Sequence, residues 1–272
     1  MRYVEGRDLV FELRWADGKV DQLPILAKEL VGFAPDLIVT ATAAAAVAAK
    51  RVMPNIPIVS ATLVDPIGTG LVASLARPGG NVTGMSLVSF ETLLGKQLEF
   101  AREVISDVRR VGMLVNTQNP AALFQRDSAE AVAPGLGVTL ISAEIGAPED
   151  LNGAFGALAR QGSEIVLVLT DALFITERRR IAALAVAARL PTIGGIRDMA
   201  EAGAFVSYGT DLTENWLRAA YFVDRIIRGS RPADLPVEQP TKYQLVINLK
   251  TAAALGLAIP PALLAGADEV IE

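Results

Sequence analysis

One stretch decides the fold of this chain: Ile56-Pro57-Ile58-Val59-Ser60-Ala61-Thr62-Leu63-Val64-Asp65-Pro66-Ile67-Gly68. An apolar run of strand length ends at a polar turn, and a short apolar segment then leads through Gly79-Gly80-Asn81 into another strand. In parallel α/β sheets, ligands bind at the carboxyl ends of strands, where this stretch places a hydroxyl and a carboxylate. It carries no catalytic set, so it indicates binding more than chemistry.

Outward from this stretch, strand-like and helix-like segments alternate along the chain. Before it we expect strands at residues 9–14 and 36–40 and helices at 21–31 and 42–53. After it, a second series has strands at 111–115, 138–145, 165–170 and 192–196, helices at 90–105, 121–133, 149–160 and 177–189, and a return segment with strands at 204–208 and 245–249. This rhythm predicts an α/β fold with two doubly wound parallel sheets and right-handed crossovers, although one continuous sheet has the same periodicity.

Composition excludes several classes of function. The chain has 272 residues, a net charge of −5, no cysteine and no histidine. Disulfides, thiolate nucleophiles, Cys/His metal sites and imidazole catalysis are therefore excluded. Phosphate backbones need clustered Lys and Arg, and no basic face is visible, which argues against a nucleic-acid partner. No apolar run is long enough to span a membrane, and the glycines lack a nucleotide-binding pattern, so we expect no cofactor and no metal.

Candidate ligand contacts in the first series follow its strands. Thr40 and Thr42 flank the start of a helix, whose free N–H groups and positive dipole end can hold a carboxylate. Thr42 is also a plausible helix cap. Thr62 and Asp65 follow the next strand, and Asp65 either starts a turn before Pro66 or receives a ligand ammonium or hydroxyl.

The second series offers a comparable set of candidates. Asn116 and Asn119 follow one strand, with Asn119 as the plausible cap of a helix that starts at Pro120. Asp171 and Phe174 follow the strand at 165–170; an acid beside an aromatic suits an amino acid or aromatic ligand, and a capping Asp with a core Phe is the alternative. The remaining candidates are Arg197 and Tyr208, of which Tyr208 is at least as well explained by packing.

Short segments spread in order along the whole chain match one known family. They are Tyr3-Val4-Glu5-Gly6, Arg14-Trp15-Ala16-Asp17-Gly18, Asp65-Pro66-Ile67-Gly68, Arg178-Arg179-Arg180-Ile181, Ser207-Tyr208-Gly209 and residues 75–84, 234–242, 245–252 and 267–272. Through them the sequence resembles the periplasmic substrate-binding proteins of ABC importers, in the family that includes tryptophan/tyrosine-binding members. The match is specific for the family and weakly specific for the ligand.

The resemblance implies a bilobed, type I periplasmic-binding-protein fold that binds a small solute in a cleft between lobes. We expect an N-terminal lobe of residues 1–82 and 206–234 and a C-terminal lobe of residues 83–205 and 235–272. The implied function is capture of an amino acid or related carboxylate by a monomer and delivery to a membrane permease. Two alternatives stay open, a carboxylate-based enzyme and a sensory ligand-binding module, and the absence of Cys and His argues against the enzyme.

The start of the chain departs from the family pattern. Such proteins begin with an export signal, a first strand and a first helix, whereas residues 1–6 lie at the turn that follows that helix. No signal peptide is visible, so the resemblance implies export or a periplasmic location only for a longer form. If the first strand is missing, residues 9–14 and 36–40 should each face a vacant slot in the sheet.

Overall fold

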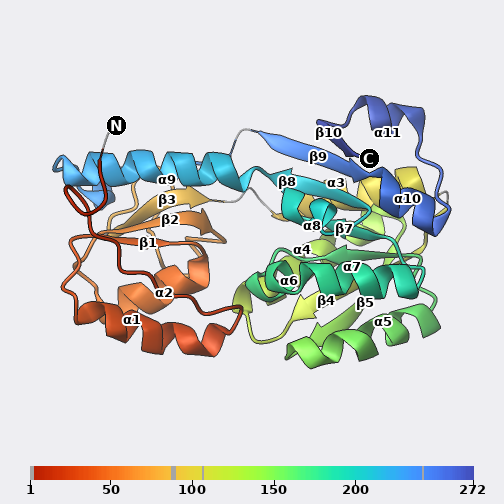
Figure 1. Cartoon of the computed structure of the whole chain (residues 1–272), viewed down its shortest axis with the longest axis horizontal. Helices are drawn as coiled ribbons and strands as arrows, with labels where there is room; N and C mark the ends of the chain where they lie inside the picture. Colours follow the sequence, from red (N-terminus) through yellow and green to blue (C-terminus); the bar gives the residue numbers. More distant parts are fainter. Residues whose placement is uncertain (1–2, 87–89, 106, 241) are drawn as a thin grey trace. The chain divides into compact units, whose positions relative to one another are not determined.

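The computed structural model describes residues 3–86, 90–105, 107–240 and 242–272. The chain divides into two compact units. Unit 1 comprises residues 1–87 and 212–240, and unit 2 comprises residues 88–211 and 241–272. Figure 1 shows their elements, and each unit is described below by itself.

Unit 1 is built around three parallel strands in the order β1-β2-β3. Its elements are α1 (Leu23–Val31), β1 (Ile38–Thr40), α2 (Ala43–Val52), β2 (Ile58–Leu63), β3 (Val82–Ser86) and α9 (Leu212–Ile227), with short 3-10 turns at Val20–Gln22 and Pro232–Asp234. Helix α2 lies on one side of the strands and α9 on the other (Figure 1).

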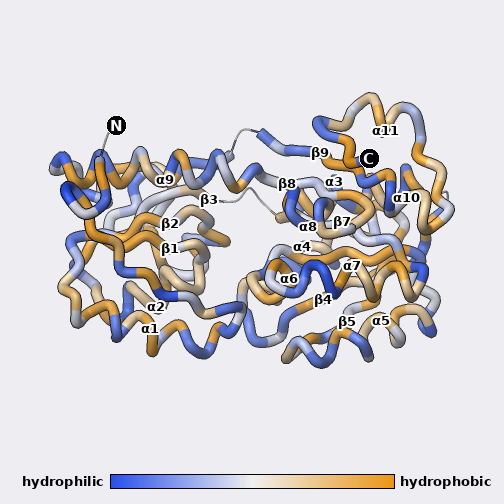
Figure 2. The backbone as a smooth tube through the Cα atoms, viewed as in Figure 1, coloured by the Kyte–Doolittle hydropathy of each residue, from blue (hydrophilic) through white to orange (hydrophobic). Residues whose placement is uncertain are grey.

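Alternation of side chains along β2 gives unit 1 its two hydrophobic layers. Ile58 packs with Ala46 of α2, while its neighbour Val59 packs with Ala219 and Phe222 of α9. Successive strand residues face opposite sides of a sheet, so an apolar run with both faces buried forms a strand covered by helices. In Figure 2 the strands β1 and β2 are mostly hydrophobic, whereas α9 alternates between hydrophobic and hydrophilic residues.

The strand predicted at residues 9–14 does not form. The segment makes a single bridge, between Glu5 and Leu9, and belongs to neither sheet. Most of its side chains are exposed, with Val10 at 81% and Leu13 at 61%, and Leu9 and Arg14 are half-buried. Alternating hydrophobicity makes a strand only where a neighbour supplies hydrogen bonds, and none of the described strands lies beside this segment. Among the described strands, β1 lies at the edge of its sheet and pairs only with β2.

Unit 2 holds a seven-stranded sheet in the order β10-β9-β8-β7-β6-β4-β5. Its strands are β4 (Arg110–Asn116), β5 (Thr139–Ile145), β6 (Ile165–Val168), β7 (Thr192–Gly194), β8 (Val206–Thr210), β9 (Tyr243–Asn248) and β10 (Glu269–Ile271). Its helices are α3 (Phe90–Val104), α4 (Pro120–Val132), α5 (Leu151–Arg160), α6 (Ala172–Thr176), α7 (Arg178–Ala187), α8 (Arg197–Glu201), α10 (Leu249–Leu255) and α11 (Pro261–Ala265), with short 3-10 turns at Ala133–Leu136 and Pro148–Asp150.

The sheet of unit 2 is mixed, which corrects the expectation of a purely parallel one. Strand β9 runs antiparallel to β8, and Tyr208 faces Leu245 across the pair. The chain leaves unit 2 after β8 and returns after residue 240, so β9 enters from the end at which β8 stops. β10 then pairs with β9 in parallel.

The unit boundaries differ from those expected by a few residues. β3 pairs with β2, so residues 83–86 belong to unit 1, and β8 pairs with β7 and β9, so residues 206–210 belong to unit 2. Residues 235–240 stay with unit 1, where Glu238 bridges to Met85 beside β3. The chain first leaves unit 1 after β3, and it leaves unit 2 after β8. Each of these strands is therefore completed in the unit to which its neighbours belong.

Candidate functional site

The N-terminus of α2 is the best-formed polar site in unit 1. Thr42 is the N-cap in extended conformation, and its Oγ1 accepts a hydrogen bond from Ala45 N at 3.2 Å. The sequence predicted this cap. The first four amides of a helix lack intrahelical acceptors, and the amides of Ala43 and Ala44 make no hydrogen bond within the described residues.

Thr40 lies directly before this helix start, at the end of β1. The residue is only 6% exposed, and its Oγ1 has no hydrogen-bond partner in the described part of the chain. It shares the α2 side of the sheet with Ile38, two residues earlier. Buried hydroxyls without a partner are uncommon in native proteins, so Thr40 adds an unsatisfied polar group beneath the helix start.

Thr62 and Asp65 shape the loop after β2. The Thr62 hydroxyl donates to Ala41 O, which ties the ends of β2 and β1 together. Asp65 has a φ of +39°, a conformation that Asp tolerates better than most residues. Its Oδ1 accepts from Gly68 N at 3.0 Å, so the predicted turn role holds. Its Oδ2 makes no hydrogen bond within the described residues.

In unit 2, Asp171 organises the ends of β4 and β6. Its Oδ1 accepts from Asn116 Nδ2 at 2.9 Å and from Leu173 N at 2.8 Å, and its Oδ2 accepts from Asn119 Nδ2 at 2.7 Å. Asn116 is 1% exposed and Asp171 is 3% exposed. The fold therefore brings three of the predicted residues together, as a buried network at one end of the sheet.

Asn119 and Asp171 also act as helix caps. Asn119 Oδ1 accepts from Ala121 N at 3.0 Å at the start of α4, and Asp171 caps α6 through Leu173 N. The two side chains thus position both helix starts beside the strand ends. With this hydrogen bonding, the Asp171 carboxylate would have to exchange a partner to contact a ligand.

Three predicted residues lie outside this network. Phe174 is fully buried, so its ring is not presented to a ligand. This agrees with the alternative that the sequence left open, in which Phe174 is a core residue. Tyr208 packs edge-on against Phe100 of α3, at a centroid distance of 5.1 Å, and stacks on Tyr243 at 5.7 Å. Its ring faces α3 because it stands on the helix-covered face of β8.

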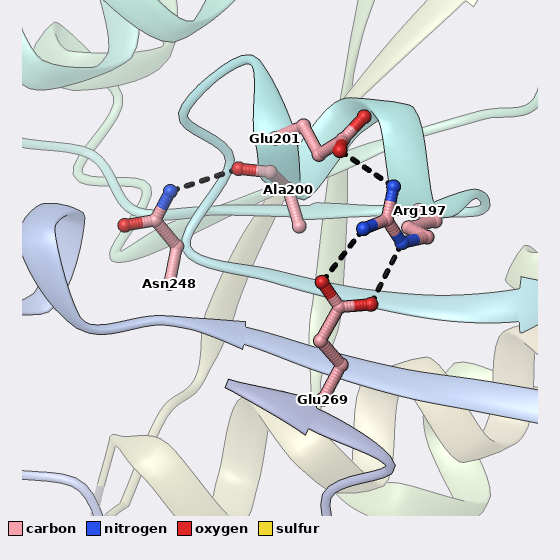
Figure 3. Close-up of polar contacts among 5 residues, drawn as sticks. All are labelled: Arg197, Ala200, Glu201, Asn248 and Glu269. Atoms are coloured by element: carbon pink, nitrogen blue, oxygen red, sulfur yellow. Dashed lines mark hydrogen bonds and ion pairs between the residues drawn. The ribbon is translucent and has the colours of Figure 1, made fainter. Parts of the chain in front are cut away.

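Arg197 is engaged by two carboxylates (Figure 3). Its Nε and Nη2 each lie 2.7 Å from an oxygen of Glu269, and its Nη1 lies 2.5 Å from Glu201. The hydrogen bonds that Arg197 donates to Glu269 and to Glu201 raise the pKa of Arg197, Glu269 having the larger effect, and Arg197 lowers the pKa of Glu269. This fork joins α8 to β10, and the two carboxylates already balance the charge of Arg197.

The sequence analysis missed two buried glutamines. Gln125 of α4 brackets Thr170: its Oε1 accepts from Thr170 N at 3.1 Å and its Nε2 donates to Thr170 O at 3.0 Å. Gln97 of α3 donates to Tyr208 O at 2.7 Å. Neither glutamine belongs to a sequence motif. Their backbone partners are distant in the sequence, so only the folded structure reveals these contacts.

The arrangement suits binding rather than catalysis. Within the described residues no group of three or more acidic side chains is arranged to hold a metal ion, and no helix of that part is long and apolar enough to cross a membrane. The chain has no histidine or cysteine. Two α/β units carry hydroxyls, amides and carboxylates at the carboxyl ends of their strands, which is where proteins with such sheets bind ligands.

Comparisons with known proteins give the family. The model of the family described as ABC transporter substrate binding protein matches residues 2–271. The chain belongs to this family, a non-enzymatic class of ligand-binding proteins. The predicted resemblance and the type I fold are thereby confirmed.

Three relatives illustrate the match. A tyrosine-binding protein of Clostridioides difficile is 25% identical over 255 residues, which cover 94% of this chain and 73% of the relative. A conserved domain protein of Vibrio cholerae is 30% identical with a TM-score of 0.93, over 98% of this chain and 89% of that one. A domain from Streptococcus pneumoniae in complex with L-Trp is 25% identical with a TM-score of 0.86, over 93% of this chain and 85% of that one.

Proposed function

We propose that this chain captures a free amino acid, with an aromatic one as the first candidate, and delivers it to the membrane permease of an ABC importer. The family supports the role of a solute-binding component outside the cytoplasmic membrane. Two relatives, the tyrosine-binding protein and the domain in complex with L-Trp, support an aromatic amino acid. The observation that carries the proposal is the open N-terminus of α2.

In this proposal the α-carboxylate of the ligand binds at the N-terminus of α2. The amides of Ala43 and Ala44 donate to the carboxylate, and the helix dipole adds favourable charge. Thr42 holds the helix start in place through its bond to Ala45 N. Each charge-assisted hydrogen bond of this kind contributes about 1.5–3 kcal/mol.

The ammonium of the ligand binds Asp65. Its Oδ1 is engaged by Gly68 N, which fixes the carboxylate and leaves Oδ2 for the ligand. We infer that an amino acid is preferred because the unit 1 site offers both an anion subsite and a cation subsite.

Isothermal titration calorimetry with L-tryptophan and L-tyrosine tests this proposal. The methyl ester of L-tryptophan keeps the ring and the ammonium but removes the carboxylate charge, and we expect it to bind at least about tenfold more weakly. Asp65→Asn should weaken the amino acid by a similar factor, whereas Trp216→Phe, on the exposed side of α9, should not. Equal affinities for acid and ester would contradict a carboxylate subsite.

A further inference from the structure

A hollow lies in unit 2 beside the candidate residue Tyr208. It has a volume of about 360 Å³ and lies between α3, β8 and β9. Its lining includes Glu91, Gly95, Lys96 and Glu99 of α3, Tyr208 of β8 and Tyr243 of β9. Cavities that bind small molecules have volumes of about 300–1,000 Å³, so this one is at the lower end of that range.

Helix α3 leaves the space open because it presents Gly95 there. A Cβ added at Gly95 would meet no atom within 4 Å. Glu91 and Glu99 lie one helical turn to either side of Gly95 and so share its face. A glycine in a helix interior costs about 0.5–1 kcal/mol relative to alanine, and here it gives a hollow between two carboxylates.

The opposite wall is aromatic and carries an unsatisfied hydroxyl. The rings of Tyr208 and Tyr243 stack with an interplanar angle of 28°. The Tyr243 hydroxyl is buried and has no hydrogen-bond partner within the described residues. Burial raises the pKa of Tyr243 to about 12, so the phenol is neutral at physiological pH. Buried polar atoms in native proteins nearly always have a hydrogen-bond partner. A bound molecule that donates a hydrogen bond would supply the partner of this hydroxyl.

The charges on the rim favour a cation. Glu99 is paired with Lys96, whose Nζ lies 2.9 Å from Glu99 Oε2 and 4.8 Å from the centroid of Phe100. Glu91 is exposed and makes no ion pair within the described residues. The Glu99–Lys96 pair is neutral, so the charge of Glu91 remains on a hollow that two tyrosines also line, and aromatic faces attract cations.

We propose that this hollow binds a small organic ammonium ion that carries an aromatic or apolar group. The ammonium lies against Glu91 and donates to the Tyr243 oxygen, and the apolar group fills the space above Gly95. Glu91, Tyr208 and Tyr243 each lie within a few residues of one of the three points at which the chain passes between the units. A ligand here therefore contacts unit 2 beside all three connections.

Calorimetric titration with phenethylammonium, up to millimolar concentrations, tests the proposal, with 3-phenylpropionate as the anion of similar size. We expect the wild-type protein to bind the cation and not the anion. Glu91→Gln should weaken the cation about tenfold, as loss of a charge-assisted contact predicts, and Gly95→Leu should abolish binding by filling the hollow. Glu149→Gln, an exposed acid elsewhere in unit 2, is the matched control.

Tyr243→Phe separates ligand contact from packing. It keeps the ring and removes only an unpartnered hydroxyl, so unfolding stability should stay the same or rise, while affinity for the cation falls severalfold. L-tryptophan affinity should be unchanged in all of these variants, which distinguishes this hollow from the amino-acid site of unit 1. Absence of phenethylammonium binding, or equal binding by wild type, Glu91→Gln and Gly95→Leu, would overturn the proposal.

Discussion

The Asp171→Ala substitution tests the network that holds the strand ends of unit 2 in place. The carboxylate accepts three hydrogen bonds, from Asn116, Asn119 and Leu173. Asn116 and Leu173 are buried, so their donors lose their acceptor without access to bulk water. A buried donor left unpaired costs about 1–3 kcal/mol, and loss of a helix cap costs about 0.5–2 kcal/mol. The Leu173 bond is the cap of α6, so with the Asn116 donor we expect unit 2 to lose about 1.5–5 kcal/mol of unfolding free energy.

Urea unfolding followed by two signals measures this loss in unit 2. The two tryptophans, Trp15 and Trp216, both belong to unit 1, so tryptophan fluorescence follows that unit while far-ultraviolet circular dichroism follows both. With a urea slope of about 2 kcal/mol per molar, the part of the dichroism transition that belongs to unit 2 should shift down by roughly 0.7–2.5 M.

Two further variants calibrate the measurement. Asp171→Asn retains one acceptor oxygen and should cost about half as much as Asp171→Ala. Asp127→Ala removes an acid whose side chain is 64% exposed and paired with Arg126, and should cost about 0.5 kcal/mol or less. A loss below about 1 kcal/mol in Asp171→Ala would refute the view that this network supports the site.

Two other substitutions test the packing of unit 1 and an ion pair of unit 2. Gly84→Ala should destabilise unit 1 by at least about 2 kcal/mol, because Gly84 has a φ of +137° and a Cβ there would lie 2.0 Å from Ser60 O. Gly80→Ala, where a Cβ meets nothing within 4 Å, is the control, and equal fluorescence-detected midpoints would contradict this. Glu269→Gln should cost about 1 kcal/mol or less near pH 7. Arg197 lowers the pKa of Glu269 below the ordinary value of a glutamate, so this contribution is present above that ordinary value and is lost as the pH falls through the folded-state pKa. The difference between wild type and variant should shrink between pH 6 and pH 3, and a constant difference would show that the pair does not stabilise the folded state.

Local chemistry is what made parts of this fold predictable. The caps at Thr42, Asn119 and Asp171 follow from side chains that bond to amides two or three residues later, and such contacts depend only on nearby sequence. The run at residues 56–61 gave a strand close to β2, Ile58–Leu63, because both of its faces are apolar.

Contacts between distant segments could not be predicted in the same way. Arg197 was expected to face a ligand, but Glu269 occupies its guanidinium, and nothing near either residue indicates the pairing. Residues 9–14 alternate like a strand, yet a strand needs a neighbouring backbone, which alternation does not supply. The antiparallel direction of β9 depends on the route of the chain through residues 212–240 rather than on its own sequence.

The direct test of the account is calorimetric titration of the purified chain with the free amino acids, one at a time, beginning with L-tryptophan and L-tyrosine. The account predicts saturable binding at one site per chain, of micromolar or tighter affinity, that falls at least about tenfold in Asp65→Asn. Binding of no amino acid by a chain that dichroism shows to be folded, or undiminished binding in Asp65→Asn, would contradict the site proposed at α2 and the loop after β2.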